Sequence, residues 1–472
     1  MSDENYAEPV VAIIGGGFSG AAVAFHLAQA SEAAIGRIVV FEPREKLGAG
    51  LAYDTRDPAH RINVPASRMS LLPNEPEQFL RWIEENGGVA GDLEAERPDG
   101  QLFPRRRVFG DYVNAMVSPF VQSGRIVQVR SLVTEVEREE SHWLIKAENG
   151  NRLTADILVL ATSHPAPAAP RSLAAALGDH PRFVADPTRP GALDVIGRND
   201  RLLIVGNGLT SADVVASLAI PGHRGHITAI SRRGLRSRGH PSFPQEPFGD
   251  FVSRSFQRAT DLLRTVRSSI RQAEAAGLTW HAVIDQVRTQ GQDLWRSLPV
   301  SERRRIVRHL RPYWDVHRFR VAPQVENVLK EALSEGRLEI LAASVVSVAV
   351  ENGEVRCLLR PRYSSTPIER HFDAVVVTTG PAHLGILSSQ RWIGDLAERG
   401  YLSLDAAGLG LACNEQSEAL GSSGAVAPSL YIAGPLARGT FGELMGLPQV
   451  SEHALFVAAR VLDRAGELSK AA

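Results

Sequence analysis

Residues 10–28 read VVAIIGGGFSGAAVAFHLA, and residues 201–219 read RLLIVGNGLTSADVVASLA. Each stretch contains a short apolar strand, a turn rich in glycine and the start of a helix, with the spacing G-x-G-x-x-G in the turn. The three glycine positions of the two turns are occupied by Gly15, Gly17 and Gly20, and by Gly206, Gly208 and Ser211. Two such turns in the same strand–turn–helix context predict two Rossmann-like dinucleotide-binding units.

Each position of the turn has a physical role. The first glycine permits a tight turn, the second lets a pyrophosphate approach the backbone, and a small third residue packs the helix against the strand. The helix N-terminus then directs its partial positive charge toward the phosphates. We therefore expect cofactor contacts from the glycine positions and from the first helical residues, Phe18, Ser19, Leu209 and Thr210.

The residues that end the next strand distinguish the two units. Glu42, followed by Pro43, ends the strand RIVVFEP about twenty residues after the first turn, where a carboxylate accepts hydrogen bonds from a ribose. Arg232 and Arg233 occupy the equivalent place after the second turn, where guanidinium groups bind an adenosine 2′-phosphate. This predicts FAD or NAD in the first unit and NADPH in the second. The alternative is that Glu42 is only a charge at a strand end and the arginines belong to a solvated turn.

Composition predicts a large soluble enzyme of two or three domains. The 472 residues are 44% hydrophobic with a formal net charge of −1, which argues against binding to nucleic acid or to anionic membranes. The two cysteines, Cys357 and Cys413, form no C-x-x-C motif, and no zinc or iron–sulfur pattern is present, so we expect no metal. No apolar run reaches the length of a membrane span, and the acidic N-terminus does not resemble a signal peptide, so we expect a cytoplasmic protein.

The order of predicted strands and helices indicates interleaved domains. We expect a helix from Ala21 to Ala30, a β-rich excursion over 126–139 and 142–162 that suits an antiparallel meander and ends in a fully buried strand at 155–162, and helices over 250–277, 279–298 and 301–316. The predicted divisions are the FAD-binding domain (first part, 1–165), a connector (166–199), the NADPH-binding domain (first part, 200–237), a helical insertion that serves as a substrate lid (238–336), the second part of the NADPH-binding domain (337–382) and the C-terminal part of the FAD-binding domain (383–472).

The chain resembles the FAD/NAD(P)-binding oxidoreductase group, whose members begin with GGGFSG and carry H-x-x-N-V-P-A-x-x-M-S, here HRINVPASRMS at 60–70. It is more distantly similar to the N-hydroxylating flavin monooxygenases, although these usually have Pro where this chain has Phe18. The resemblance implies an α/β fold of the two-dinucleotide-binding flavoprotein type. In such proteins two buried strands return to the nucleotide domains, here ending near Thr162 and Thr379, and the last strand places Gly434 and Pro435 near the flavin.

Further residues are expected at the cofactors or at the substrate. We count Val64, Met69, Val133 and Leu447 among the residues that bind the cofactors. Asn63 and His60 are candidates for a catalytic polar contact to a flavin hydroperoxide, and the alternative is that they only fix the loop backbone. His240, His317 and Arg318 are candidates for the substrate site, where Arg318 would hold a carboxylate; the alternatives are a turn residue and a cluster of caps and salt bridges.

The sequence thus leads to one preferred function and two alternatives. We expect an NADPH-dependent FAD monooxygenase that uses dioxygen to N-hydroxylate a small amine or amino acid. An FAD-dependent NAD(P)H oxidoreductase that passes electrons to an acceptor other than oxygen is the second hypothesis. The third is a nucleotide-sensing protein that binds FAD and NADPH without turnover.

Overall fold

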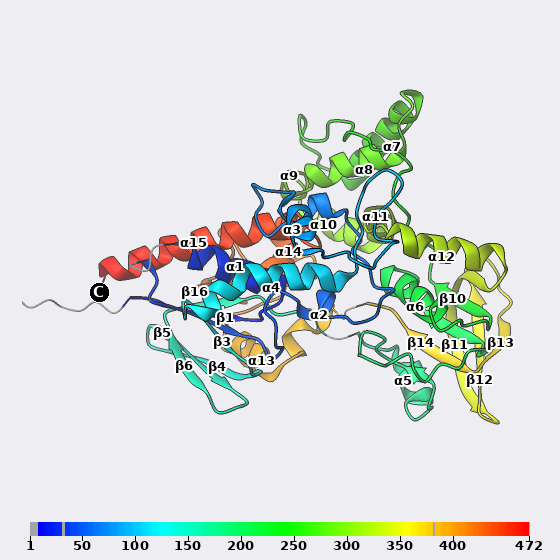
Figure 1. Cartoon of the computed structure of the whole chain (residues 1–472), viewed down its shortest axis with the longest axis horizontal. Helices are drawn as coiled ribbons and strands as arrows, with labels where there is room; N and C mark the ends of the chain where they lie inside the picture. Colours follow the sequence, from blue (N-terminus) through cyan, green and yellow to red (C-terminus); the bar gives the residue numbers. More distant parts are fainter. Residues whose placement is uncertain (1–7, 31–33, 164, 166, 381–382, 472) are drawn as a thin grey trace, which may run out of the picture.

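The computed structural model describes residues 8–30, 34–163, 165, 167–380 and 383–471. Its strands form a six-stranded sheet, a seven-stranded sheet and a small three-stranded sheet. The two large sheets lie toward opposite ends of the long axis, and helices α7 (Ala259–Ala275) and α8 (Trp280–Thr289) project beside them (Figure 1). This is the predicted α/β architecture with two Rossmann-like units and helices between their strands.

The first large sheet has the strand order β15-β16-β7-β1-β2-β3. Its members are β1 (Val10–Ile14), β2 (Arg37–Phe41), β3 (Ile126–Val129), β7 (Ile157–Leu160), β15 (Glu418–Leu420) and β16 (Val426–Ile432). All neighbours pair in parallel except β15 and β16. Strands β1 and β7 are buried on both faces, which explains their continuous apolar sequences. The C-terminal strand β16 returns to this sheet beside β7, as the resemblance implied.

The small sheet joins β4 (Val133–Glu139), β5 (His142–Ala147) and β6 (Arg152–Ala155) in an antiparallel meander. The prediction of a meander is correct for these strands and wrong for residues 126–129, which form β3 and pair in parallel with β2. The short sequence IVQV fits either arrangement by its periodicity. Burial of Ile126 in the core of the first unit, where it is 1% exposed, decides the pairing.

Helix α1 (Phe18–Ala28) packs against the C-terminal helix α15 (Gln449–Ala471). It starts three residues before the predicted Ala21, because the backbone becomes helical directly after Gly17. The other helices of this part of the chain are α2 (Gly50–Tyr53), η2 (Ala66–Arg68), α3 (Gln78–Asn86), α4 (Arg106–Gln122), η4 (His383–Ser388), α13 (Arg391–Glu398), η5 (Gly434–Ala437) and α14 (Arg438–Phe441).

The second large sheet has the order β13-β12-β11-β10-β9-β14-β8. Its strands are β8 (Phe183–Val184), β9 (Leu202–Val205), β10 (Ile227–Ser231), β11 (Leu338–Glu351), β12 (Glu354–Pro361), β13 (Ile368–Phe372) and β14 (Ala374–Val377). The predicted connector, 166–199, contains α5 (Arg171–Leu177) and the edge strand β8, so part of it belongs to this sheet. Residues 164 and 166 beside and within this segment lie outside the described residues.

Helices dominate residues 238–336, as the sequence predicted. They are α7, α8, α9 (Gly291–Ser297), α10 (Val300–Arg305), the π-helix η3 (Ile306–Leu310), α11 (Arg311–Arg318) and α12 (Pro323–Ser334). The first of them begins at Ala259 and not at residue 250, because the Asp250 carboxylate accepts hydrogen bonds from the backbone of Val252 and Ser253 and holds a turn there. Helix α12 packs on α6 (Leu209–Ala219) of the second unit, whereas α7 and α8 share a small core of their own.

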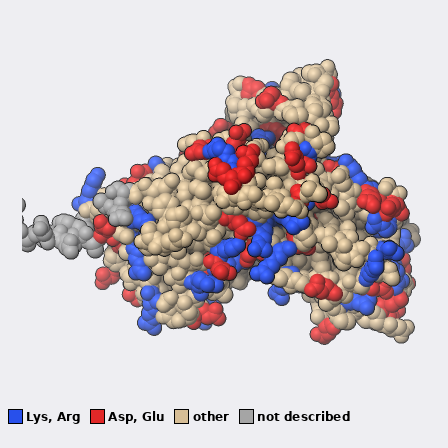
Figure 2. Space-filling view, in the orientation of Figure 1, with Lys and Arg blue, Asp and Glu red and all other residues tan. Residues whose placement is uncertain are grey.

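Basic and acidic side chains are interspersed over the face that Figure 2 shows. Among the described residues, no helix is long and apolar enough to cross a membrane. Within the same residues, no three His, Cys, Asp or Glu side chains gather as a metal site would require. Both cysteines are buried and unbridged, and burial raises the thiol pKa to about 12 for Cys357 and about 11 for Cys413.

Candidate functional site

The first glycine turn is held by close backbone contacts. Gly15 has φ +100°, and its N–H donates to the Phe41 carbonyl at 3.0 Å. A Cβ atom on Gly15 would lie 2.5 Å from the Ala161 carbonyl oxygen, and one on Gly20 would lie 1.8 Å from that of Gly15. Neither position accommodates a side chain, so both glycines are required for the turn itself.

The middle glycine of this turn has a different environment. A Cβ atom on Gly17 would meet only the Gly50 Cα, at an ordinary contact distance of 3.5 Å. Gly17 also caps α1 without a side-chain hydrogen bond, so the first N–H groups of the helix have no capping side chain. The Phe18 ring packs 5.6 Å from the Phe109 ring, so its side chain is engaged with protein and the predicted cofactor contact falls to its backbone. Unlike Gly15 and Gly20, Gly17 is therefore not required to be glycine by contacts with the protein atoms around it.

Glu42 is 3% exposed and fixes the same turn. One carboxylate oxygen accepts a hydrogen bond from the Gly16 N–H at 3.0 Å, and the other accepts from the backbone N–H and the guanidinium of Arg44, both at 3.1 Å. A carboxylate has about four acceptor positions. One remains for a ribose hydroxyl, so the residue fits both its structural role and the predicted cofactor role. Pro43 is exposed beside it.

The end of β16 meets the first glycine turn. Gly434 has φ +68°, and a Cβ atom there would lie 2.2 Å from the Ser19 hydroxyl oxygen, so the two predicted cofactor residues are in contact. The Gly434 N–H donates to Nδ1 of His453 at 3.1 Å, and Nε2 of this histidine is 3.1 Å from the Ser417 hydroxyl. Burial lowers the pKa of His453 to about 3, so the ring is neutral and can accept this hydrogen bond. The sequence analysis missed His453, because a histidine within a helix has no distinctive spacing.

The second glycine turn repeats the arrangement with one difference. Gly206 has φ +117°, and a Cβ atom there would lie 2.5 Å from the Thr378 carbonyl oxygen. A Cβ atom on Gly208 would meet nothing within 4 Å. The third position is Ser211, whose side chain is accommodated at 2% exposure. Leu209 and Thr210 form the first turn of α6, so their backbone N–H groups lie at the N-terminus of that helix.

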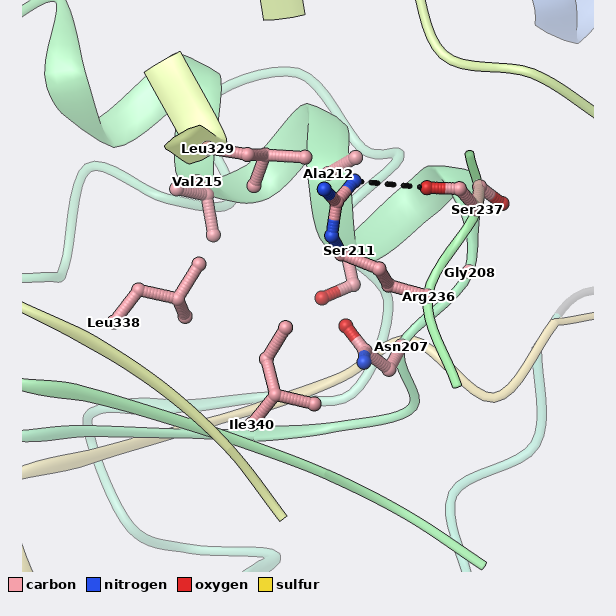
Figure 3. Close-up of a pocket in the computed structure, with 10 residues that line it drawn as sticks. All are labelled: Asn207, Gly208, Ser211, Ala212, Val215, Arg236, Ser237, Leu329, Leu338 and Ile340. Carbon is pink, nitrogen blue, oxygen red and sulfur yellow. Dashed lines mark hydrogen bonds between the residues drawn. The ribbon is translucent and has the colours of Figure 1, made fainter. Parts of the chain in front are cut away.

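The arginines after β10 have separate environments. Arg232 is exposed, whereas the Arg233 guanidinium lies 5.4 Å from the centre of the Tyr313 ring on α11. Arg236, which the sequence analysis did not select, lines a small pocket together with Asn207 and Ser211 (Figure 3). Its Nη1 donates to the Ser237 carbonyl at 3.1 Å, and its guanidinium lies 3.8 Å from Glu326. The basic run RRGLRSRG was a usable signal for this residue.

The segment 60–70 connects the two units. His60 contacts the Thr55 hydroxyl through Nδ1 at 2.8 Å and the Ser217 hydroxyl of α6 through Nε2 at 3.4 Å, and burial lowers its pKa. Asn63 accepts a hydrogen bond from the backbone N–H of Ala322 at 3.2 Å through its side chain. Its backbone carbonyl accepts from Nε2 of His240 at 3.0 Å. These contacts of His60 and Asn63 are with protein groups and attach the segment to the second unit.

A neighbouring ion pair strengthens this connection. Arg106, at the start of α4, forms a two-point contact with Asp213 on α6, at 3.0 and 2.9 Å. Its Nε also donates to the Arg61 carbonyl at 2.8 Å. Both partners are largely buried, with side-chain exposures of 16% and 13%. Because the planar guanidinium bonds a carboxylate at two points, the pair fixes the orientation of α4 against α6.

The three predicted substrate residues have partners within the protein. His240 is half-buried in contact with the Phe103 ring, and burial together with Arg320 lowers its pKa to about 3. Nδ1 of His317 bonds the Tyr313 carbonyl of the same helix at 2.7 Å. Arg318 is 6% exposed, and its Nε donates to Glu443 at 3.0 Å. The structure therefore shows the cluster of salt bridges that the sequence analysis had left as an alternative for Arg318.

The remaining predicted cofactor residues are distributed around the two units. Val64 packs on the large core that runs through both units, and Met69 is buried within it. Val133 begins β4 and is 7% exposed. Thr162 and Thr379 each lie two residues after a strand, β7 and β14 respectively, and Pro435 lies in η5. Leu447 is buried before α15, where its carbonyl accepts a hydrogen bond from Arg288.

Comparison with family models agrees with the first glycine turn. Residues 12–165 match the family model described as FAD-NAD(P)-binding. This region contains β1, the first glycine turn, Glu42, the segment 60–70 and β7. Comparison with curated proteins gives no match.

Comparison with solved structures extends the likeness to nearly the whole chain. Ornithine hydroxylase from Pseudomonas aeruginosa superposes with a TM-score of 0.65 at 16% identity, over 97% of this chain and all of the other. L-lysine 6-monooxygenase from Pseudomonas syringae gives a TM-score of 0.64 at 18% identity, over 98% of this chain and all of the other. An ornithine N-hydroxylase from Kutzneria sp. 744, described with reduced FAD, NADP⁺ and L-ornithine, gives a TM-score of 0.65 at 16% identity, over 97% of this chain and 99% of the other.

At sequence identities this low, the superpositions establish a shared fold and nothing more. Together with the two glycine turns, they confirm the predicted architecture from the first strand to the last helix. The chain thus carries an FAD-NAD(P)-binding domain over residues 12–165 and has, over nearly its whole length, the two-dinucleotide-binding flavoprotein fold.

Proposed function

We propose that the protein is an NADPH-dependent FAD monooxygenase that hydroxylates the nitrogen of a small amine or amino acid. The observation that carries this proposal is the pair of glycine turns, whose middle glycines are free of close protein contacts, within a fold shared over nearly the whole chain with ornithine and lysine hydroxylases. The charges after each turn assign the coenzymes, because Glu42 suits a ribose and Arg232 suits a 2′-phosphate.

FAD fits the first unit. The absent side chain of Gly17 would give the pyrophosphate space, and the N-terminus of α1 would face it with its partial positive charge. The remaining acceptor position of Glu42 would take the ribose, and the backbone at Gly434 would lie beside Ser19 along the path toward the flavin. Bound FAD would supply the redox chemistry, namely the acceptance of a hydride and the activation of dioxygen.

NADPH fits the second unit in the corresponding way. A side chain at Gly208, at the N-terminus of α6, would meet no protein atom within 4 Å, and exposed Arg232 has no ion pair among the described residues that a 2′-phosphate would have to replace. Arg236 lies beside Ser211 at the same turn, where it would be a second guanidinium near the coenzyme, although Glu326 already compensates part of its charge (Figure 3). The pair Arg106–Asp213 would hold this unit in a fixed orientation toward the first, so that hydride transfer occurs between aligned rings.

His60 and Asn63 would contribute by excluding water. Their side-chain contacts attach the segment 60–70 to α6 and to the start of α12, which would close the space between the units. The helices of residues 238–336 would form the lid on another side. Trp295 of α9 donates to the Gly439 carbonyl at 2.7 Å, and Arg288 of α8 bonds Gln449, so these helices contact the loop that follows Gly434.

Oxygen consumption tests the proposal. The protein reconstituted with FAD should oxidise NADPH slowly alone, and a correct amine should stimulate oxygen uptake and yield a hydroxylated product. Oxygen uptake that no amine stimulates, with all electrons recovered as hydrogen peroxide and rapid reduction of dyes or quinones, would instead favour the oxidoreductase alternative. Failure of NADPH to reduce the bound flavin would favour the nucleotide-sensing alternative.

A further inference from the structure

Four deeply buried arginines gather where the helices of 238–336 meet the loop after Gly434. Arg288 belongs to α8, Arg318 ends α11, Arg320 follows α11, and Arg438 begins α14; they are 8%, 6%, 9% and 5% exposed. Buried arginines are uncommon unless a carboxylate or another anion compensates them. The partners of these four therefore decide what the cluster can bind.

Three carboxylates lie in the cluster, and each is engaged by one arginine. Asp285 holds Arg320 at 2.9 and 3.1 Å. Glu443 accepts from Nε of Arg318 at 3.0 Å, and Asp315 accepts from Nε of Arg311 at 3.2 Å. The carboxylates of the cluster are thus used for Arg311, Arg318 and Arg320.

Among the described residues, neither Arg288 nor Arg438 has a carboxylate within ion-pair distance, although Glu443 attracts both guanidinium groups at longer range. Arg288 donates only to neutral groups, the Leu447 carbonyl and Gln449 Oε1, the latter at 2.9 and 3.1 Å. Within the described part of the chain, the Arg438 guanidinium has no hydrogen bond, ion pair or ring contact, and its Nη1 is enclosed. Exposed Arg68 of the segment 60–70 lies in electrostatic range of Arg288 and Arg320 and adds a further positive charge.

The balance of charge is therefore positive, with six arginines against three carboxylates. Desolvation lowers the pKa of Arg288 to about 9 and lowers the pKa values of Arg320 and Arg438, which means that burial disfavours their charged forms. An anion bound to Arg438 or to Arg288, which share Arg318 and Glu443 as neighbours, would reduce this penalty and would form charge-assisted hydrogen bonds with the guanidinium. A cationic diamine in the same place would increase it.

The position of the cluster connects it to the proposed reaction. Arg438 lies four residues after Gly434, which contacts the first glycine turn through Ser19, and Arg288 bonds the residues that precede α15. The cluster belongs to neither glycine turn, so the pyrophosphates expected there would not neutralise it. A substrate that reaches the flavin from the side of α8 and α11 would meet these side chains.

We propose that Arg438 and Arg288 bind an anionic group of the substrate, either a carboxylate or a phosphate, and that the substrate is an acidic amine and not a diamine. The amine part rests on the proposed function, whereas the anionic part rests on the charge balance of this cluster.

Binding can be measured without turnover. Full-length protein loaded with FAD is titrated with L-glutamate, phosphoethanolamine or cadaverine at constant ionic strength, and its thermal unfolding midpoint is followed. A saturable rise with glutamate or with phosphoethanolamine supports the proposal, and the stronger of the two identifies the anionic group. No rise with either, or a rise with cadaverine alone, overturns it.

Variants locate the site. Arg438→Gln should weaken the response to the anion at least tenfold and leave the protein without ligand no less stable, because it removes an uncompensated buried charge. Arg438→Lys should retain part of the response. Arg391→Gln, at a side chain that is 92% exposed, removes an arginine elsewhere and should change nothing. Arg288→Gln provides a second test if Arg438→Gln does not fold.

Two further outcomes would overturn the assignment. One is an unchanged anion response in Arg438→Gln. The other is a changed flavin spectrum in that variant with the anion response intact, which would assign the guanidinium to the cofactor. If anions bind as expected but NADPH never reduces the flavin, the proposed function fails and the anion site stands. If NADPH and oxygen are consumed in the presence of an amine while anions do not bind, the anion site fails and the proposed function stands.

Discussion

The two glycine turns have the same backbone geometry but differ in how tightly the helix meets the strand. In the first, a Cβ atom on Gly20 would lie 1.8 Å from the Gly15 carbonyl oxygen, whereas the second has a buried serine, Ser211, at the same position. In both, the first glycine is needed for the turn and the middle glycine leaves space. The difference shows that the residue at the third position depends on the spacing between helix and strand, whereas contacts within the protein do not determine the residue at the middle position.

The turns also differ in their neighbours. Glu42 bonds directly to the first turn, and Gly434 adds the support of His453, so the first unit is fixed before any ligand binds. In the second unit, by contrast, Arg232 is exposed and forms no ion pair with another described residue. We infer that the first site is preformed and that part of the second is ordered by its coenzyme.

The largest effect should come from the third position of the first turn. Gly20→Ala forces a Cβ atom onto the Gly15 carbonyl, and the helix must move, which should cost about 3 kcal/mol or more, the upper range for overpacking. Ser211→Ala, the matched change in the second turn, should cost less than about 1.5 kcal/mol. Urea unfolding measures both, and similar losses would show that the two turns are equally tight.

The middle glycines should separate binding from stability. Gly17→Ala and Gly208→Ala have room within the protein, so each should unfold within about 1 kcal/mol of the wild type, the usual size of a helix-cap change. Gly17→Ala should lose FAD, and Gly208→Ala should keep FAD but lose NADPH. Retention of FAD by Gly17→Ala at wild-type affinity would place the pyrophosphate elsewhere.

The arginines should set the choice of coenzyme. Removing the charge in Arg232→Ala should cost about 1.5–3 kcal/mol of binding, the range for hydrogen bonds to charged groups, and so weaken NADPH roughly tenfold to a hundredfold with NADH little changed. Arg236→Ala should act in the same direction. Steady-state KM values for both coenzymes give the comparison, and equal losses for NADPH and NADH would remove the 2′-phosphate assignment.

The smallest effect should appear in the pH dependence of the first unit. The pKa of His453 is about 3 in the folded protein, well below its ordinary value of 6.5. The unfolded chain therefore takes up a proton at this residue as the pH falls below about 6.5 while the folded chain does not, and stability declines until the folded pKa is reached.

His453→Asn should reduce this decline by up to about 1.4 kcal/mol per pH unit between pH 6 and 4. His240 and His281, whose pKa values are also lowered by burial, should keep the rest of the slope in both proteins. Unfolding in urea across this range tests the assignment, and an identical slope in the variant would show that His453 titrates normally.

The fold could be predicted from the sequence because the two glycine turns and the buried strands are local sequence patterns. The returning strands β7, β14 and β16 were recognisable as apolar runs, and the structure places each in the expected sheet. The assignment of residues 126–129 to the meander failed because a four-residue strand has too little periodicity to indicate its partner. The first helix after residue 250 was extended too far because a local turn at Asp250 was overlooked.

The substrate region could not be read from the sequence in the same way. Arg318 was a reasonable candidate for a carboxylate, but its partner Glu443 lies 125 residues away, and no local pattern indicates that the pair forms. Arg438 was not a candidate, because its position without an ion-pair partner among the described residues is visible only in three dimensions. Contacts between distant segments therefore decide which charged side chains remain available.

Anaerobic mixing tests the central claim most directly. Protein loaded with FAD is mixed with NADPH in the absence of oxygen, and the flavin absorbance is followed, with Gly208→Ala as the matched control. The account predicts that NADPH bleaches the flavin in the wild type faster than NADH does, and that the control stays oxidised. A wild-type flavin that NADPH leaves oxidised, or a control that bleaches as fast as the wild type, would contradict it.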